Sequence, residues 1–482
     1  MNPTPDDRTA LHDVIVVGAG PVGQTLVERA RAAGLSVAMV ERELVGGECS
    51  YWACVPSKAL LRPVVAVADT QRVEGARAAV TGRVDPQGAF ARRDRVVTNW
   101  DDAGQADSMT GLGAALVRGH GRLAGERRVT VDRPGGERVT LEARHAVVLC
   151  TGSAASLPDL PGIEEARAWN NRRATDSEDV PGRLAVVGGG GVAVEMASAW
   201  QGLGAQVTLL VRGSGVLPRM EPFVGEEVAR GLAESGVDVR TATSVTSLSR
   251  PDPAGPVTLR LDTGGELEAD EVLFATGRAP GTDDLGLDTA GLAPGSWLDV
   301  DGTCRVRGVD GGWLYAAGDV NHHALLTHQG KYQARIAGEA IGARARGLSL
   351  DEEPWGDHAT TADTQAVPQV FFCDPEAAAV GLTAAQAQQT GHRTKVVDVD
   401  MGEVQGAFLY ADGYRGHARM VVDLDHEYLL GVTFVGPGVA ELLHSATVAV
   451  AGRITMDRLW HAVPCFPTIS EVWLHLMKAY RG

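Results

Sequence analysis

The chain has 482 residues, of which 44% are hydrophobic and 22% charged, as is ordinary for a globular protein. This length exceeds what one hydrophobic core supports, so we expect two to four domains. The 61 acidic residues outnumber the 44 basic ones and leave a net charge of −17, which disfavours nucleic acid and anionic membranes as partners.

The sequence carries no sign of export or membrane insertion. No run of about 18 apolar residues occurs, so we predict no transmembrane helix. Residues 1–8 lack a basic stretch followed by an apolar one, so we expect no secretory signal and a cytoplasmic location. Six cysteines are too few for a disulfide framework, and in a cytosolic protein a close pair is more often catalytic or metal-binding than structural.

The first motif is a dinucleotide-binding fingerprint. The apolar, β-branched run 13–17 predicts a buried parallel strand, and a helical pattern covers 24–33. Three glycines stand between them: Gly18, Gly20 and Gly23. A second strand over 36–40 ends at Glu41. The glycines permit a tight turn and close approach of a ligand, the helix N-terminus faces a pyrophosphate, and the acid binds ribose hydroxyls.

Two cysteines follow within residues 46–58. Cys49 and Cys54 stand five apart, a rise of roughly 7.5 Å in a straight helix, which exceeds the Cα separation of an ordinary disulfide. If the two sulfurs pair, the helix must therefore begin in a distorted turn. The double glycine Gly46–Gly47 permits such a turn and close approach of a ligand. The alternative is two unrelated buried thiols.

The next segments are structural in character. A polar-amphipathic pattern predicts helices over 59–107, and alternating runs within 114–148 predict a small antiparallel meander. The strand 146–150 then runs into a turn at Gly152.

A second dinucleotide fold begins with the strand 183–187. The turn positions after it are Gly188, Gly190 and Ala193. The strand 206–211 ends at Arg212, where the first copy has an acid, and an arginine there suits a 2′-phosphate that a carboxylate would repel. Arg219 could supply a second contact, so we favour NADPH over NADH. The alternative is a solvated arginine without a role in selectivity. The fold closes with a strand that reaches Gly277.

The rest of the chain holds one further candidate ligand and a separate module. Asp319 follows a short apolar strand and a glycine, a suitable place to bind a sugar or ribityl hydroxyl. Composition turns polar near 349–354, where we expect a domain boundary. Beyond it, strands are predicted over 369–372, 419–422 and 429–435, and helices over 439–451 and 470–480. Without a third nucleotide motif, this part is expected to be an association domain.

Together these residues resemble the flavoprotein pyridine nucleotide-disulfide oxidoreductases, which include glutathione reductase, dihydrolipoamide dehydrogenase and mercuric reductase. The most specific match is Gly-Gly-x-Cys-x4-Cys-x-Pro-Ser-Lys at 46–58, with further matches at 275–278, 317–319 and 374–383. The resemblance implies an α/β fold with two Rossmann-like dinucleotide-binding domains and a C-terminal α+β dimerisation domain. The implied domains are an FAD-binding domain at 1–155 and 280–350, an NAD(P)H-binding domain at 156–279, and an interface domain at 351–482.

The resemblance also implies residue roles. The residues implied to hold FAD are Gly18, Gly20, Gly23, Glu41 and Asp319. Those implied to hold the nicotinamide cofactor are Gly188, Gly190, Ala193 and Arg212, with Arg219 as the second contact. The remaining glycines expected at the cofactor sites are Gly47, Gly152 and Gly277. Cys54 would face the flavin, Cys49 would exchange with substrate, and Lys58 would lie near the flavin paired with Glu195.

The C-terminus departs from the family pattern. The disulfide reductases carry His-Pro-Thr-x-x-Glu, whose histidine is an acid–base for the exchange thiol, but this chain has Phe466 there and keeps Glu471. Loss of a general acid–base typically costs about 10²- to 10⁴-fold. His461 and Cys465 could substitute, or both could merely pack at the interface. Mercuric reductases also lack this histidine, but their C-terminal vicinal cysteine pair is absent here.

No metal site is predicted. The histidines after Asp319 are His322, His323 and His328. No cysteine or carboxylate spacing makes them ligands, so we interpret them as loop and helix-start residues.

We therefore expect a homodimeric oxidoreductase that passes electrons from NADPH through FAD to a redox disulfide formed by Cys49 and Cys54. The final acceptor would be a small disulfide or another electrophile. One alternative is a reductase of quinones or metal ions that needs no disulfide exchange. Another is a redox-responsive binding protein that retains its cofactor without turnover, against which the intact Lys58 and Glu195 argue.

Overall fold

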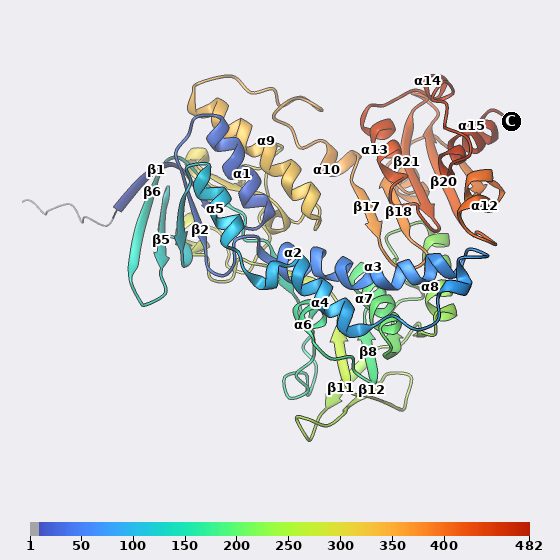
Figure 1. Ribbon diagram of the computed structural model, residues 1–482. Helices are drawn as coiled ribbons and strands as arrows, with labels where there is room; N and C mark the ends of the chain where they lie inside the picture. Colours follow the sequence, from blue (N-terminus) through green and yellow to red (C-terminus); the bar gives the residue numbers. More distant parts are fainter. Residues whose placement is uncertain (1–8) are drawn as a thin grey trace, which may run out of the picture. The chain divides into compact units, whose positions relative to one another are not determined.

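The computed structural model describes residues 9–482 (Figure 1). Residues 1–8, on which the expected absence of a secretory signal rests, lie outside the described residues. The chain divides into two compact units. The first comprises residues 9–55, Val97–Ala154 and Arg278–Thr364, and the second comprises Pro56–Val96, Ala155–Gly277 and Gln365–Gly482. Within residues 9–482, no helix combines the length and the apolar character needed to cross a membrane.

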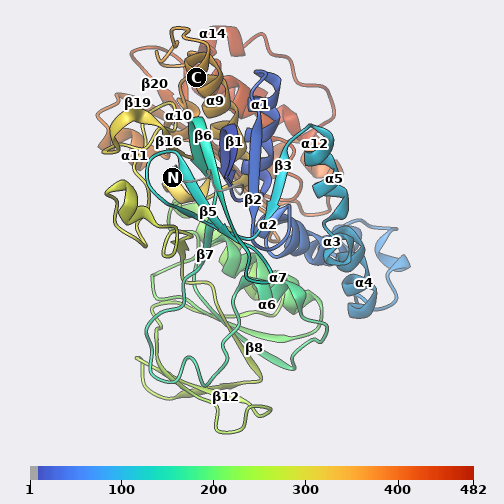
Figure 2. The same cartoon turned by 90° about the vertical axis from the view of Figure 1, so that its left-hand side faces the viewer.

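The first unit is built on a parallel sheet. β1 (Thr9–Val17) pairs in parallel with β2 (Val37–Glu41) on one side and with β6 (Arg138–Leu149) on the other. β3 (Ala115–Arg118) extends the sheet beyond β2, and β16 (Leu314–Ala316) pairs with β6 (Figure 2). All residues of β2 are buried, including Glu41, as expected for a strand inside a parallel sheet.

One edge of this sheet is antiparallel. β4 (His120–Leu123) pairs with β5 (Arg128–Asp132), and β5 pairs with the first part of β6. The predicted antiparallel meander is therefore confirmed for these strands. It is wrong for β3, which follows the helix α5 (Ala103–Gly111) and pairs in parallel with β2, because a crossover helix returns the chain in the same direction.

Two helices of the first unit pack closely against each other. α1 (Pro21–Ala32) and α9 (Thr327–Ala345) lie side by side (Figure 1). A Cβ atom on Gly338 of α9 would lie 2.5 Å from the Cβ of Arg29. The glycine therefore allows the two helix backbones to approach more closely than a side chain would permit.

The second unit contains a second parallel sheet. Its strand order is β10 (Asp238–Arg240), β9 (Gln206–Leu210), β8 (Arg183–Val187) and β14 (Glu271–Phe274). Three strands form a separate antiparallel sheet: β11 (Val245–Ser249), β12 (Val257–Leu261) and β13 (Glu266–Ala269). α7 (Gly191–Gly202) begins directly after the turn that follows β8 and buries most of its length, including Trp200.

The same unit ends in an antiparallel sheet covered by helices. Its order is β17 (Pro368–Phe371), β18 (Ala377–Gly381), β21 (Leu429–Val435), β20 (His417–Asp423) and β19 (Thr394–Asp400). α13 (Leu443–Ala451) packs on β18 and β21, and α15 (Val472–Arg481) packs on β19 and β20. The strands predicted over 369–372, 419–422 and 429–435 are present as β17, β20 and β21, whereas β18 and β19 were not predicted.

The remaining elements connect these sheets. The longer helices are α3 (Cys54–Gln71), α4 (Pro86–Val96) and α8 (Pro222–Glu234). The short elements are α2 (Gly47–Tyr51), α6 (Asn171–Asp176), α10 (Ala362–Gln365), α11 (Ala384–Gln389), α12 (Gln405–Tyr410), α14 (Met456–Leu459), β7 (Ser153–Ala155) and β15 (Arg278–Pro280). The predicted α/β fold with two dinucleotide-binding sheets and a C-terminal α+β part is confirmed.

Candidate active site

The first glycine turn is shaped for a close ligand. A Cβ atom on Gly18 would lie 2.4 Å from the carbonyl oxygen of Cys150, and one on Gly23 would lie 2.0 Å from the carbonyl oxygen of Gly18. These two glycines are therefore required by packing. At Gly20, by contrast, no described atom lies within 4 Å of a Cβ position. The backbone at the N-terminus of α1 is thus open to a ligand, as a pyrophosphate requires.

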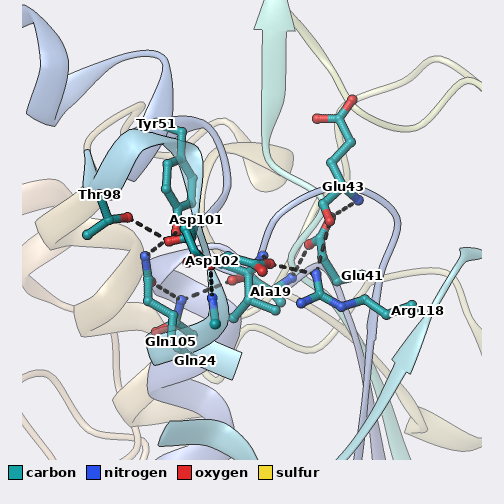
Figure 3. A network of polar contacts seen from close by, with 12 residues as sticks. Ala19, Gln24, Glu41, Glu43, Tyr51, Thr98, Asp101, Asp102, Gln105 and Arg118 are labelled. Carbon is teal, nitrogen blue, oxygen red and sulfur yellow. Dashed lines mark hydrogen bonds and ion pairs between the residues drawn. The ribbon is translucent and has the colours of Figure 1, made fainter. Parts of the chain in front are cut away.

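Glu41 lies beneath this turn. Its Oε2 accepts a hydrogen bond from the backbone N–H of Ala19 at 2.7 Å, and its Oε1 accepts one from the N–H of Glu43 at 2.7 Å (Figure 3). The residue is 9% exposed. A carboxylate that accepts one bond on each oxygen keeps lone pairs for another donor, so Glu41 still fits a ribose hydroxyl.

Asp319 belongs to a small polar cluster. Its Oδ2 accepts a hydrogen bond from the Ser153 hydroxyl at 2.5 Å and lies 3.7 Å from Nε of Arg278. Arg278 in turn donates to the hydroxyl and the carbonyl of Ser153. The side chain of Gln333 accepts from the N–H of Gly318 at 2.7 Å and so fixes the turn that presents Asp319. The motif matches identified Arg278 and Asp319, but Ser153 was missed and its only signal is its place after a strand-ending glycine.

The remaining predicted glycines all have positive φ angles. Gly47 (φ 58°) stands close to the first turn, because a Cβ there would lie 3.0 Å from the Cα of Gly20. Gly152 (φ 67°) immediately precedes β7, and Gly277 (φ 153°) precedes β15. No described atom lies within 4 Å of a Cβ position at either of them, so both backbones are open to a ligand.

The structure brings Cys49 and Cys54 together around one hydroxyl group. α2 ends at Tyr51 and α3 begins at Cys54, so the helix is interrupted between the two cysteines, as their spacing requires for pairing. Thr327 Oγ1, at the start of α9, donates a hydrogen bond to Cys49 Sγ at 3.1 Å and lies 3.3 Å from Cys54 Sγ. Both residues are half-buried thiols. The sequence reasoning missed Thr327.

The other four cysteines differ in how deeply they are buried. Cys150, Cys304 and Cys373 are buried. Burial raises the pKa of Cys150 to about 12 and raises the pKa values of Cys304 and Cys373 well above the ordinary thiol value. These three thiols stay protonated and are poor nucleophiles, since the thiolate is the reactive form. The fourth, Cys465, is exposed.

Lys58 and Glu195 form the predicted ion pair. Lys58 Nζ donates to Glu195 Oε2 at 2.6 Å, and the other carboxylate oxygen accepts from the N–H of Phe372 at 3.0 Å. Glu195 is 5% exposed, and Lys58 Nζ also lies 5.2 Å from the centre of the Phe372 ring. The buried carboxylate is therefore satisfied on both oxygens, and Lys58 is held in one place on α3, one helical turn after Cys54.

The second glycine turn repeats the geometry of the first. A Cβ on Gly188 (φ 141°) would lie 2.4 Å from the carbonyl oxygen of Ala275, whereas no described atom lies within 4 Å of a Cβ position at Gly190. Ala193, at the third position, is fully buried on α7. This arrangement opens the N-terminus of α7 to a ligand.

Two arginines follow this turn. Arg212 and Arg219 are both exposed and lie on the loop after β9. The N–H of Leu217 donates to the carbonyl of Gly189 at 2.7 Å, which ties the loop to the glycine turn. A guanidinium on such a loop fits an added phosphate beside the nucleotide.

The C-terminal motif lacks a titratable group at the family's histidine position. The Phe466 side chain is exposed (74%), as are His461 and Cys465. Glu471 is half-buried at the end of the 3₁₀ turn Ile469–Glu471, and its Oε2 atom is buried without a hydrogen-bond partner among the described residues. Among residues 9–482, no imidazole therefore forms a hydrogen bond with this oxygen of Glu471.

The histidines near Asp319 have structural partners. The ring of His322 stacks on Trp297 at a centroid distance of 4.2 Å. His323 Nδ1 lies 3.5 Å from Oδ2 of the buried Asp363. Among residues 9–482, no three His, Cys, Asp or Glu side chains form a group that could hold a metal ion.

Comparisons with known proteins agree with this geometry. Residues 12–343 match the family model described as pyridine nucleotide-disulphide oxidoreductase, and residues 367–477 match that family's dimerisation domain. The chain is 32% identical to a mercuric reductase of Shigella flexneri, over 96% of this chain and 79% of that protein. It is 31% identical to dihydrolipoyl dehydrogenase 3 of Pseudomonas aeruginosa, over 95% of this chain and 96% of that protein.

A solved structure supports the fold. The HOCl-induced flavoprotein disulfide reductase RclA of Escherichia coli, solved as a Cu(II) complex, superposes with a TM-score of 0.82 at 23% identity, covering 97% of this chain and 99% of that chain. The family matches lead to one assignment. The chain belongs to the pyridine nucleotide-disulphide oxidoreductase family and is an FAD-dependent oxidoreductase that uses a pyridine nucleotide.

Proposed function

We propose that this protein oxidises NADPH and delivers the electrons, through FAD and the Cys49–Cys54 pair, to a small disulfide or another electrophilic acceptor. The observation that carries the proposal is the contact of one hydroxyl group, on Thr327, with both sulfur atoms. Adjacent, half-buried thiols at an interrupted helix can close to a disulfide and reopen, which two separate buried thiols cannot do.

Two sites hold the cofactors in this proposal. The first glycine turn with Glu41 and Asp319 holds FAD, within residues 1–155 and 280–350. The second turn, within 156–279, holds NADPH, and Arg212 and Arg219 bind its 2′-phosphate. Bound FAD would supply two-electron transfer between the nicotinamide and a disulfide at this site.

Lys58 and Glu195 support this transfer electrostatically. Glu195 holds the ammonium group of Lys58 through a hydrogen bond of 2.6 Å. A fixed cation stabilises negative charge that develops beside it, and its own anionic partner reduces the cost of placing it at a partly desolvated site. Lys58 is the candidate for this role because it lies on the same helix as Cys54.

The thiols complete the reaction with a disulfide acceptor. Cys49 thiolate attacks one acceptor sulfur, a mixed disulfide forms, and the first acceptor thiol leaves with a proton. Cys54 thiolate then attacks Cys49 Sγ, which restores the Cys49–Cys54 disulfide and releases the second acceptor thiol. Each step forms one S–S bond and breaks one, and the two electrons pass to the acceptor.

A second candidate is reduction of quinones or metal ions. Phe466 favours it, because a phenylalanine cannot protonate a leaving thiol and its exposed ring offers an apolar contact to a flat aromatic acceptor.

His461 and Cys465 are exposed nearby in sequence and are the candidates to replace the missing acid–base in the disulfide reaction.

We further propose that the protein is a homodimer, through residues 351–482. The match to the family's dimerisation domain supports this. Several large apolar side chains in that part are exposed: Phe408, Leu409, Tyr410, Val463 and Phe466. Sedimentation at the mass of one 50.5 kDa chain would contradict the proposal.

An anaerobic titration tests the proposed route. The oxidised holoenzyme is reduced stepwise with dithionite and then with NADPH while the flavin absorbance is followed. Uptake of two electrons before the flavin bleaches, with a long-wavelength thiolate-to-flavin band, supports the thiol route. Immediate bleaching, unchanged by Cys49→Ser and Cys54→Ser, would overturn it and favour direct reduction of a quinone such as menadione.

A further inference from the structure

The segment between the two cysteines contains a buried tyrosine whose hydroxyl is tied to another part of the first unit. Tyr51 is the last residue of α2 and is 1% exposed. Its hydroxyl accepts a hydrogen bond from Gln105 Nε2 at 2.9 Å and donates toward the carbonyl oxygens of Val45 and Asp101 at 3.3 and 3.4 Å. Burial raises the pKa of Tyr51 above its ordinary value, so the hydroxyl stays protonated.

The hydrogen bonds continue from Gln105 to the first glycine turn. Gln24 Nε2, on α1, donates to Gln105 Oε1 at 2.9 Å and to the carbonyl of Ala19 at 3.1 Å (Figure 3). Ala19 stands between Gly18 and Gly20, and its N–H donates a hydrogen bond to Glu41. An unbroken chain of hydrogen bonds therefore runs from the turn expected to bind the FAD pyrophosphate to the helix that carries Cys49.

The glycine before α2 is shaped by the same contacts. A Cβ on Gly46 would lie 2.5 Å from Gln105 Nε2 and 2.7 Å from the Tyr51 ring. The N–H of Gly46 also donates to the carbonyl of Ala19 at 2.9 Å. Tyr51 and Gln105 thus close over the Gly46 backbone and fix the start of α2, two residues before Cys49.

We infer that Tyr51, Gln105 and Gln24 form a positioning relay that holds Cys49 against Thr327 and Cys54. The inference rests on the proposed role of Cys49 as the exchange thiol. The three side chains act on Cys49 through the placement of α2. Loss of the relay frees α2, weakens the contact between Cys49 and the Thr327 hydroxyl, and lowers the effective concentration of one thiol at the other.

The test uses Tyr51→Phe and Gln105→Met, which remove the hydroxyl and the amide with little change in volume. Tyr315→Phe is the matched control, because Tyr315 is also buried in this unit and its hydroxyl accepts from Arg344 at 2.6 Å. Iodoacetamide alkylation of Cys49 in the reduced holoenzyme is measured against pH, with the modified peptide identified by mass spectrometry. The dithiol–disulfide equilibrium is measured against a thiol buffer.

Loss of one net hydrogen bond predicts Cys49 alkylation about 2- to 12-fold slower at pH 7 and a dithiol–disulfide equilibrium shifted by a similar factor toward the dithiol. That factor corresponds to a change of about 10–30 mV in the reduction potential of the Cys49–Cys54 pair. In a double-mutant cycle, Gln105→Met adds little to Tyr51→Phe, because both break the same relay. Tyr315→Phe matches the wild type.

Unchanged alkylation and equilibrium in both variants would overturn the inference, as would fully additive effects. Alkylation does not require the pair to be redox-active. A wild-type pair that takes up no electrons therefore contradicts the proposed function, whereas an alkylation rate insensitive to Tyr51 contradicts the relay.

Discussion

Replacing Thr327 by valine isolates the contribution of the one hydroxyl that contacts both sulfur atoms. Valine keeps the branched shape and removes the hydrogen bond of 3.1 Å to Cys49 Sγ. A hydrogen bond to a charged group contributes about 1.5–3 kcal/mol. Complete loss would therefore lower the thiolate population of Cys49 by about 10- to 150-fold at a pH where the thiol form predominates. Because both cysteines are half-buried and water can partly replace the donor, we expect alkylation of Cys49 to slow by about 10-fold.

The assay is the pH dependence of iodoacetamide alkylation of the reduced enzyme. Thr327→Ser is the control, since it keeps the hydroxyl and loses only a methyl group, and it should retain the wild-type profile. In the proposed route Cys54 faces the flavin, and the same hydroxyl lies 3.3 Å from Cys54 Sγ. The long-wavelength thiolate-to-flavin band at pH 7 should therefore also weaken in the valine variant and persist in the serine variant. Identical profiles in the wild type and the valine variant would refute the view that this hydroxyl stabilises the thiolate.

Three further predictions follow from other parts of the structure. Arg212→Glu should lower kcat/KM for NADPH by at least about 10- to 150-fold, the contribution of one charge-assisted contact, and leave kcat/KM for NADH little affected; equal losses for both would contradict the proposed selectivity. Phe466→His should raise turnover of low-molecular-weight disulfides, by up to about 10²- to 10⁴-fold, without raising quinone turnover. Burial alone would raise the pKa of Asp13, but hydrogen bonds from Ser36 and Arg144 lower it from 3.8 to about 2. This contribution to the free energy of unfolding is complete above pH 3.8 and is lost as the pH falls toward 2. In Asp13→Asn, the free energy of unfolding measured with urea should therefore fall less steeply between pH 4 and pH 2 than in the wild type.

The dinucleotide folds were predictable because their signals are local. The run 13–17 is short, apolar and β-branched, and glycines follow it at fixed spacing, so strand, turn and helix are encoded within about 20 residues. β19 was missed, although its exposed and buried residues partly alternate, because it lies at the edge of its sheet and its Asp and Lys residues weaken the apolar pattern. β3 was predicted with the wrong direction, since pairing direction depends on the connection rather than on the strand's own residues.

The candidate site was predictable only in part. Cys49, Cys54, Lys58 and Glu195 stand in motifs, and the structure brings Lys58 and Glu195 together as expected. Thr327 lies 278 residues from Cys49 along the chain, and no pattern in its own neighbourhood distinguishes it from any threonine at a helix start. Gln105 is likewise an ordinary polar residue on a short helix, and only the fold brings it to Tyr51.

The first unit is assembled from three separate stretches of the chain, and this affects how it is made. β16 begins at Leu314, far beyond β1, so about 15 to 60 s of ribosomal synthesis separate these two strands of one sheet. Thr327 emerges later still. During that interval the nascent chain carries Cys49 and Cys54 without the hydroxyl that contacts them in the finished fold. We therefore expect the two thiols to be more accessible to oxidants and electrophiles on the ribosome than in the native protein.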